Sequence, residues 1–279
     1  MSFSRLIGYP LPSLTFIDVG AMNLGSEPYA PLVDQGLGRV IGFEPVIEEC
    51  NRLNELHRCK GHQYLACAVG DGAKGSFNIC NYPMTSSLFQ PNTPLVQKFQ
   101  NLGNLMEVVR SSEIVTRRLD DIPEVAEADY LKMDAQGAEL SILCGAAETL
   151  EQVMIVHTEV EFVPLYVGQP LFADVDTELR RQGFSFHRFT GIAGRPFKPF
   201  MQNGDPNKSI SQQLWADAVY VKDFMRFAEL PVSKLLKLAI MLHELYQSYD
   251  LCALALEAFD EKTGFGLQKK YCAGVTAQT

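Results

Sequence analysis

Two carboxylates at the ends of two apolar segments are the residues of this chain that most directly suggest chemistry. The segment FIDVG (16–20) carries Asp18 before a glycine turn, and IGFEP (41–45) carries Glu44 at its end. If the two segments are neighbouring parallel strands, both acids lie at the edge of an open α/β sheet where ligands bind. A carboxylate at the second strand's tip can accept both hydroxyls of a ribose, and a turn of small residues lets the backbone approach the rest of the ligand. The pair predicts a site for a nucleotide-type cofactor; the alternative is that both acids are solvated strand ends.

A second cluster of polar residues lies in DYLKMDAQGAEL (129–140). An apolar strand ends at Asp134 and turns through a glycine into a helix, which directs Asp134 and Gln136 into the same crevice. An acid at the end of a central apolar strand needs a partner or a ligand. Glu139 falls in the first helical turn, where a carboxylate also favours the helix dipole, so a structural and a functional role both stay open for it.

The elements that must position these residues alternate between strand-like and helix-like patterns, which predicts a mostly parallel α/β sheet. The expected strands are 14–19, 39–44, 63–69, 130–134, 154–159, 185–190 and 216–221. Helices are expected over 138–150 and 172–182. Residues 76–80 favour a short extra strand, and 81–104 hold too many Pro, Asn and Ser residues to be regular, which is typical of a functional lid.

A helical tail is expected after Phe224, so we divide the chain into a main domain (1–223) and a carboxyl-terminal extension (224–279). Leu235, Leu242 and Tyr249 recur at helical spacing, and a second helix is expected over 251–262. The simplest interpretation is that this apolar stripe packs on the main domain. The alternative is that it forms a homo-oligomer interface.

The composition bounds the class of protein. With 279 residues, 47% hydrophobic and 20% charged, the chain can bury one large core plus an appendage. A net charge of -9 argues against a nucleic-acid partner. Seven cysteines form no CxxC pair, which favours reduced thiols over disulfides or zinc. The chain shows no apolar leader and no run of about 18 apolar residues, so we expect no membrane span and a cytoplasmic location.

The motifs of this chain resemble the FkbM family of S-adenosylmethionine-dependent methyltransferases over roughly residues 14–222. The segments that carry the resemblance are FIDVG, GFEP, SSL (86–88), RLDD (118–121) and DYLKMDAQGAELSILCGA (129–146). The fairly specific KxDxxGxE pattern is met by Lys132, Asp134, Gly137 and Glu139. The resemblance implies a Rossmann-like class I methyltransferase fold, a mostly parallel seven-stranded sheet whose last strand is antiparallel. It also implies methyl transfer, usually to a hydroxyl oxygen.

The same resemblance implies the cofactor and the residues around it. Glu44 would take the ribose diol of S-adenosyl-L-methionine, and Ala68 would border the adenine. The family commonly reads DVGAN where this chain reads DVGAMN, so Asn23 follows an additional Met22. The full set of expected cofactor contacts is Asp18, Gly20, Ala21, Asn23, Glu44, Cys67, Ala68, Val69, Asp134 and Gln136.

Methyl transfer to an alcohol requires an aligned acceptor oxygen and a group that takes up the hydroxyl proton. The candidates are Asp134 and, on MIVHTEVEF (154–162), His157 and Glu159. By alternation His157, Glu159 and Glu161 share one face if the strand extends that far. Histidine has the best pKa for a general base, but in an apolar strand it is more often a core residue. An Asp134–Glu159 pair could instead hold a divalent cation such as Mg²⁺ that acidifies the hydroxyl.

The expected acceptor is a small molecule, a sugar or glycan hydroxyl or a secondary-metabolite alcohol. Tyr166, Phe172 and Trp215 are candidates for lining its pocket, and Ser86 and Ser87 are expected near the cofactor. Two other classes stay open. An NAD(P)-type oxidoreductase would also use a carboxylate at the second strand but would be expected to show a glycine fingerprint. A non-catalytic cofactor-binding scaffold would have no need of an acid at the fourth strand's tip.

Overall fold

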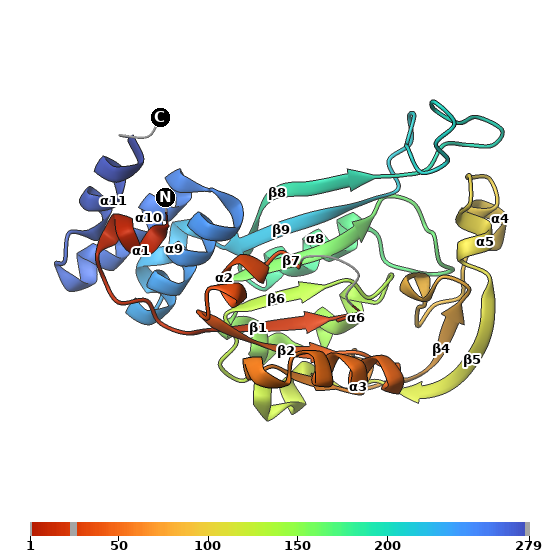
Figure 1. Cartoon of the computed structure of the whole chain (residues 1–279), viewed down its shortest axis with the longest axis horizontal. Helices are drawn as coiled ribbons and strands as arrows, with labels where there is room; N and C mark the ends of the chain where they lie inside the picture. The colour runs from red at the N-terminus through yellow and green to blue at the C-terminus, as the bar shows by residue number, and fades with distance from the viewer. Residues whose placement is uncertain (1, 23–26, 277–279) are drawn as a thin grey trace.

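A seven-stranded sheet forms the centre of the molecule (Figure 1). The computed structural model describes residues 2–22 and 27–276, and it orders the strands β3-β2-β1-β6-β7-β9-β8. Strand β9 is antiparallel to both of its neighbours, whereas the remaining pairs are parallel. The predicted class I methyltransferase sheet is therefore confirmed. The strands are β1 (Leu14–Val19), β2 (Gly38–Phe43), β3 (Gln63–Leu65), β6 (Tyr130–Met133), β7 (Ile155–Glu161), β8 (Phe184–Ala193) and β9 (Trp215–Lys222).

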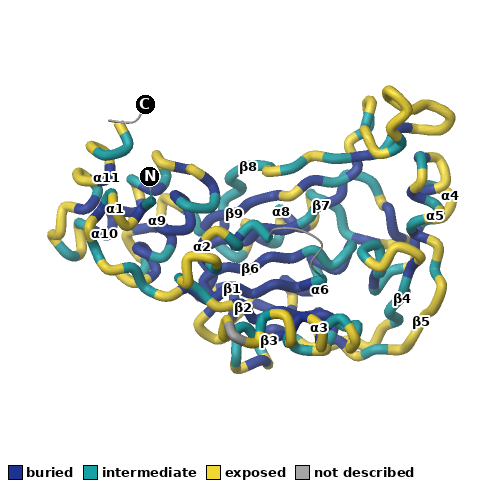
Figure 2. Tube along the Cα trace, viewed as in Figure 1, coloured by how far each residue is buried: buried dark blue, intermediate teal, exposed yellow. Residues whose placement is uncertain are grey.

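The central strands form where the sequence has continuous apolar runs. Every residue of β1 and β6 is buried, as Figure 2 shows for the middle of the sheet. Parallel strands covered on both faces need such runs, because neither face meets water. The expected strand over 63–69 is shorter than predicted, since β3 ends at Leu65 and Val69 pairs only through an isolated bridge to Arg117.

Helices cover both faces of the sheet (Figure 1). Residues of α2 (Ala30–Asp34), α3 (Ile47–Leu56) and α9 (Val232–Tyr246) pack in one core cluster, and residues of α6 (Glu139–Cys144), α7 (Ala147–Gln152) and α8 (Phe172–Arg181) pack in the other. A single helix was expected over 138–150. It divides into α6 and α7, with Gly145 and Ala146 between them. Position 145 requires glycine, because a Cβ there would lie 2.1 Å from the carbonyl oxygen of Gly70.

A two-stranded hairpin stands at the carboxyl ends of the parallel strands (Figure 1). The predicted short strand is β4 (Lys74–Cys80), and it pairs with β5 (Val108–Val115), which the sequence did not predict because most of its residues are polar or exposed. The segment between them is more regular than expected. It contains a 3-10 turn (Pro83–Thr85) and two short helices, α4 (Thr93–Val96) and α5 (Leu102–Leu105).

The carboxyl-terminal residues form a helical group at the opposite end of the molecule (Figure 1). After a 3-10 helix (Phe224–Glu229) come α9, α10 (Tyr249–Thr263) and α11 (Leu267–Thr276), and the amino-terminal α1 (Phe3–Ile7) packs beside α11. None of the described helices is both long and apolar enough to cross a membrane.

Helix α9 is part of the main core. Leu235 and Leu242 are fully buried and share a cluster with Phe16 and Tyr130 of the sheet. Asp129 at the start of β6 has no exposed side-chain surface, and it pairs with Lys234 and Lys237 of α9 at 2.8 Å. Leu235 and Leu242 are therefore turned inward, which agrees with packing on the main domain, whereas Tyr249 is 37% exposed; self-association of the chain stays a prediction. A helix that is apolar on most sides is usually buried, and the side chains around α9 belong to this same chain.

Candidate active site

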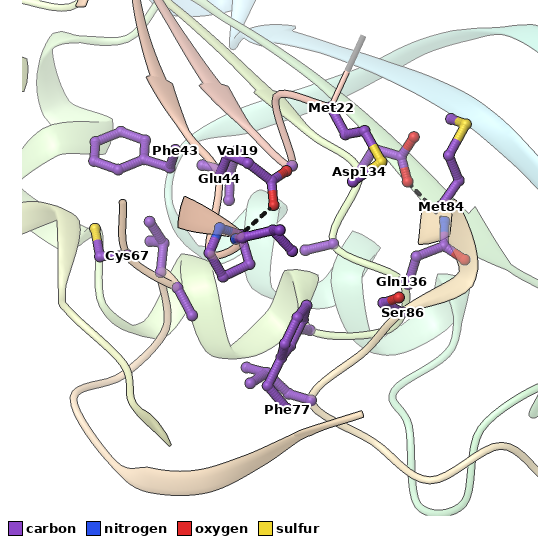
Figure 3. Close-up of a pocket in the computed structure, with 18 of the residues that line it drawn as sticks. Val19, Met22, Phe43, Glu44, Cys67, Phe77, Met84, Ser86, Asp134 and Gln136 are labelled. Atoms are coloured by element: carbon purple, nitrogen blue, oxygen red, sulfur yellow. Dashed lines mark hydrogen bonds between the residues drawn. The ribbon is translucent and has the colours of Figure 1, made fainter. Parts of the chain in front are cut away.

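A pocket opens above the carboxyl ends of β1, β2 and β6 (Figure 3). Figure 3 shows Phe43 and Cys67 at one end and Asp134, Met84 and Gln136 at the other. The full lining is Val19, Gly20, Met22, Phe43, Glu44, Pro45, Val46, Cys67, Ala68, Val69, Phe77, Pro83, Met84, Ser86, Leu88, Asp134, Ala135, Gln136 and Ala138. Seven of the ten residues expected around the cofactor are in this lining: Gly20, Glu44, Cys67, Ala68, Val69, Asp134 and Gln136. Its position is where ligands bind in open α/β sheets.

Glu44 is the acid of this pocket on the β2 side. Its side chain is 3% exposed, and one oxygen accepts a hydrogen bond from the backbone nitrogen of Val46 at 2.8 Å. Burial is the main cause that raises the pKa of Glu44 to about 7. The bond to Val46 fixes the carboxylate's direction, so the group is oriented to accept hydroxyl donors at the pocket wall.

Asp18 lies beneath the pocket and is not part of its lining. Its Oδ1 is 3.0 Å from Nζ of Lys132, and its Oδ2 accepts a hydrogen bond from the Tyr29 hydroxyl at 2.5 Å. Burial works against the charged form of Lys132, but the carboxylates of Asp18, Asp134 and Glu27 outweigh it and raise the pKa of Lys132. The buried Lys132 cation thereby fixes the Asp18 carboxylate and, with it, the turn that follows β1.

Gly20 brings the β1 turn against the end of β6. Its φ is +76°, and a Cβ there would lie 1.9 Å from the carbonyl oxygen of Asp134. Lys132 Nζ also donates to the Gly20 carbonyl at 3.1 Å. The glycine is required by this contact between two strand ends as well as by any ligand. Ala21 is buried in the core beside it, and Asn23 lies outside the described residues.

A second cavity adjoins the first on the β7 side. It is built from the segment 82–106, the ends of β6 and β7, and the start of β9. Met84, Asp134 and Gln136 line both cavities, so the two spaces meet at these residues. The full lining is Tyr82, Met84, Thr85, Leu102, Leu105, Met106, Asp134, Gln136, Glu159, Leu165, Tyr166, Arg195 and Trp215.

Gln136 joins the acids at this junction. Its amide nitrogen donates to Asp134 Oδ1 and to Glu159 Oε2, each at 2.7 Å, and its amide oxygen accepts from the Tyr166 hydroxyl at 2.9 Å. Its φ of +52° is unfavourable for a residue with a side chain. The conformation is held by the Ser87 hydroxyl, which donates to the Gln136 carbonyl at 2.6 Å. Strained backbone of this kind is typical of functional sites.

The two acids at the junction differ in environment. Burial, followed by the charges of Asp134 and Glu161, raises the pKa of Glu159 well above its ordinary value. Glu159 therefore holds a proton more readily than an ordinary glutamate does. Strand β7 continues to Glu161, so His157, Glu159 and Glu161 share one face as expected.

The metal alternative finds no support in this arrangement. A donating amide nitrogen, rather than a gap for a cation, lies between the carboxylates of Asp134 and Glu159. Among residues 2–22 and 27–276, no group of three or more His, Cys, Asp or Glu is arranged to hold a metal ion.

His157 lies below the junction and lines neither cavity. Its Nδ1 is 3.1 Å from the Tyr246 hydroxyl on α9, and its Nε2 is 3.5 Å from the Thr190 hydroxyl. Burial lowers the pKa of His157 to about 4. His157 therefore lies outside the two cavities that Asp134 lines, and its contacts are those of a core residue that ties α9 to the sheet.

Glu139 has a structural role in this turn. Its side chain is 2% exposed and accepts a hydrogen bond from the backbone nitrogen of Ala135 at 2.8 Å, which closes the loop between β6 and α6. Burial raises its pKa to about 7.

Two residues of the site were missed or given no role by sequence reasoning. Lys132 was recognised only as part of a motif, although a lysine inside the apolar strand YLKM already signals a buried anion. Arg195 belongs to an irregular loop without a pattern, and only the folded chain brings it to the second cavity.

The fold and the site together define a class I methyltransferase-type α/β protein. Residues 18–186 match the family model described as methyltransferase FkbM domain. The match spans more than half of the chain, so this protein belongs to the FkbM methyltransferase family.

A curated relative and several solved structures are also similar. The 2-O-methyltransferase NoeI of Sinorhizobium fredii is 42% identical over 67 residues, which cover 23% of this chain and only 28% of NoeI. Precorrin-6y C5,15-methyltransferase from Geobacter metallireducens has 9% identity and a TM-score of 0.35, over 78% of this chain and 87% of that chain. A structure described as a putative methyltransferase from Thermoplasma acidophilum has 7% identity and a TM-score of 0.38, over 78% and 71%.

Proposed function

We propose that this protein is an S-adenosylmethionine-dependent O-methyltransferase that acts on a hydroxyl of a sugar, a glycan or a secondary metabolite. The observation that carries the proposal is the junction of two cavities at Met84, Asp134 and Gln136. The first cavity suits a nucleoside and the second can take an acceptor, so the shared residues lie where a methyl group would pass from one to the other.

The first cavity fits S-adenosylmethionine. Glu44 is positioned to accept the ribose hydroxyls, and Phe43, Cys67 and Val69 offer an apolar wall for the adenine. The described lining of the cavity contains no Lys or Arg, which agrees with a cofactor that has no phosphates. When bound, S-adenosylmethionine supplies an electrophilic methyl group.

The chain's own residues then act on the acceptor. Asp134 faces both cavities, so its free oxygen is placed to accept the hydrogen bond of an acceptor hydroxyl and to take up its proton. The hydrogen bond from Gln136 fixes the orientation of the Asp134 carboxylate. Glu159, which Gln136 also contacts, is protonated in this scheme, so it places no second negative charge beside Asp134. Trp215 supplies a flat ring for a sugar or another alcohol, whereas the ring of Tyr166 is buried and its hydroxyl positions Gln136. The name of NoeI, a 2-O-methyltransferase, supports oxygen as the methylated atom.

Calorimetric titration with S-adenosylhomocysteine and with NAD tests the cofactor. Binding of S-adenosylhomocysteine and not NAD is expected, whereas preference for NAD would favour the oxidoreductase. A screen with S-[methyl-³H]adenosylmethionine against sugars, glycans and alcohols then tests catalysis. Cofactor binding without transfer to any acceptor would favour the non-catalytic scaffold.

A further inference from the structure

Arg195 is the only cation in the described lining of the second cavity. It follows β8, and its guanidinium carbon lies 5.1 Å from the ring centroid of Trp215. Trp215 begins β9 and pairs with Ala193 at the end of β8, so two paired strand ends fix the arginine and the ring on which it stacks. The stacking orients the guanidinium but leaves its hydrogen-bond donors free.

The guanidinium of Arg195 is incompletely satisfied. One terminal nitrogen, Nη1, donates to the carbonyls of Gly194 at 3.0 Å and Asn207 at 3.4 Å. Among the described residues, neither the buried Nε nor Nη2 has a hydrogen-bond partner, and Asp205 acts on Arg195 through its charge without forming an ion pair. A guanidinium that lines a cavity and keeps a terminal donor unused, here Nη2, is suited to an oxyanion, because a carboxylate accepts a charge-assisted hydrogen bond from it.

Arg195 and Asp134 reach the second cavity from the ends of different strands. Asp134 follows β6 and Arg195 follows β8, with β7 and β9 between them. Three strand steps of about 4.8 Å place the two strand ends roughly 14 Å apart. Carboxylates at one end and a cation at the other would orient an acceptor whose own charge is negative, with its anion away from the reacting hydroxyl.

We infer that Arg195 binds a carboxylate of the acceptor, and that the acceptor is therefore a sugar acid or a glycan that contains one. The inference rests on the proposed function, because it treats the second cavity as the acceptor site. It adds the chemical class of the acceptor and names Arg195 as the residue that selects it, with the Trp215 ring as the surface on which the sugar stacks.

Trp215 is the only tryptophan of the chain, so intrinsic tryptophan fluorescence reports on this cavity. The experiment titrates the full chain, saturated with S-adenosylhomocysteine, with sodium glucuronate and separately with glucose at constant ionic strength. Saturable fluorescence changes with glucuronate binding at least about tenfold more tightly than glucose are expected. Equal affinity for the two sugars, or no saturable response to glucuronate, would overturn the inference.

Three variants assign the effect to Arg195. Arg195→Gln should abolish the preference for glucuronate. Arg195→Lys should restore part of it, because it keeps the charge but not the planar fork. Lys198→Gln removes a charge from an exposed position of the same loop, outside the cavity lining, and should leave the preference unchanged. A preference that survives in folded Arg195→Gln, or that is lost equally in Lys198→Gln, would contradict the assignment.

Calorimetry with S-adenosylhomocysteine on the same samples distinguishes a failure of the acidic-acceptor inference from a failure of the proposed methyltransferase function. If S-adenosylhomocysteine binds but glucuronate and glucose are not distinguished, the acidic acceptor is wrong and the methyltransferase proposal stands. If S-adenosylhomocysteine does not bind, the cofactor proposal fails, whereas an Arg195-dependent response to glucuronate would still establish the anion site.

Discussion

Lys132 and Asp18, on adjacent strands β6 and β1, form a buried ion pair with 3.0 Å between Nζ and Oδ1. Only 10% of the lysine side chain and 2% of the aspartate side chain are exposed. The same lysine donates to the carbonyl of Gly20, so one cation fixes both the acid and the turn beneath the first cavity. Such a pair specifies geometry, since its attraction mainly offsets the cost of burying two charges.

Lys132→Met should lower the free energy of unfolding by about 3–5 kcal/mol, because it leaves the Asp18 carboxylate buried without its cation. Urea denaturation measures the change. Lys60→Met serves as the control, since Lys60 and Asp34 are exposed and 3.5 Å apart, and a loss below about 1 kcal/mol is expected there. Equal losses in the free energy of unfolding for the two substitutions would show that the buried Lys132–Asp18 pair stabilises the fold no more than an exposed pair.

Glu44→Ala should weaken S-adenosylhomocysteine binding by more than about tenfold while the fold survives, since it removes charge-assisted hydrogen bonds worth roughly 2–3 kcal/mol. Isothermal titration calorimetry gives the affinity. Glu48→Ala, at an exposed position of α3, is the matched control and should bind like the wild type. Unchanged affinity in Glu44→Ala would remove Glu44 from the cofactor site.

Cofactor affinity should depend on pH through Glu44. Burial raises its pKa to about 7, and the ionised carboxylate is the better acceptor for ribose hydroxyls. Affinity for S-adenosylhomocysteine should therefore rise between pH 6 and pH 8, as the group loses its proton. Titrations at both pH values on wild type and Glu44→Gln test this, because the variant lacks the titrating group and should show a flatter profile.

Asp134→Asn should reduce turnover by roughly a hundredfold or more and leave S-adenosylhomocysteine binding near the wild-type value. A methyl-transfer assay and calorimetry give the two quantities. His157→Gln is the contrasting variant, since His157 contacts Tyr246 rather than either cavity, and it should affect stability more than turnover. Wild-type turnover in Asp134→Asn, or a larger loss in folded His157→Gln, would reverse the assignment of the base. A chelator should leave the wild-type rate unchanged if no metal takes part.

Leu242→Glu should destabilise the chain by at least about 4 kcal/mol, because the Leu242 side chain of α9 is fully buried in the core that α9 shares with the sheet. Thermal unfolding followed by circular dichroism measures this. Leu254→Glu, at a position of α10 that is 38% exposed, should change stability by less than about 1 kcal/mol. If instead Leu242→Glu gave a folded monomer from a wild-type oligomer in light scattering, the stripe would be an interface after all.

Much of the fold could be predicted because parallel strands must be apolar along their whole length. The expected strand over 14–19 coincides with β1, and the expected strand over 130–134 lies within one residue of β6. The hairpin partner β5 could not be predicted, because an exposed antiparallel strand such as VVRSSEIV has no continuous apolar run. The close approach of Gly145 to the backbone of Gly70 could not be predicted either, because the two residues are far apart in the sequence.

The sequence by itself determined the alternating α/β architecture, the family, and the positions of Glu44 and Asp134 at the ends of their strands. These features follow from local periodicity and from where an apolar run stops. Only the tertiary structure decided which polar groups meet. It paired Lys132 with Asp18, placed the Gln136 amide between Asp134 and Glu159, removed His157 to the α9 interface, and brought Arg195 to the second cavity. The physical reason is that hydrogen bonds and ion pairs act over a few ångströms in space, and the chain reaches those distances only when separate strands lie side by side.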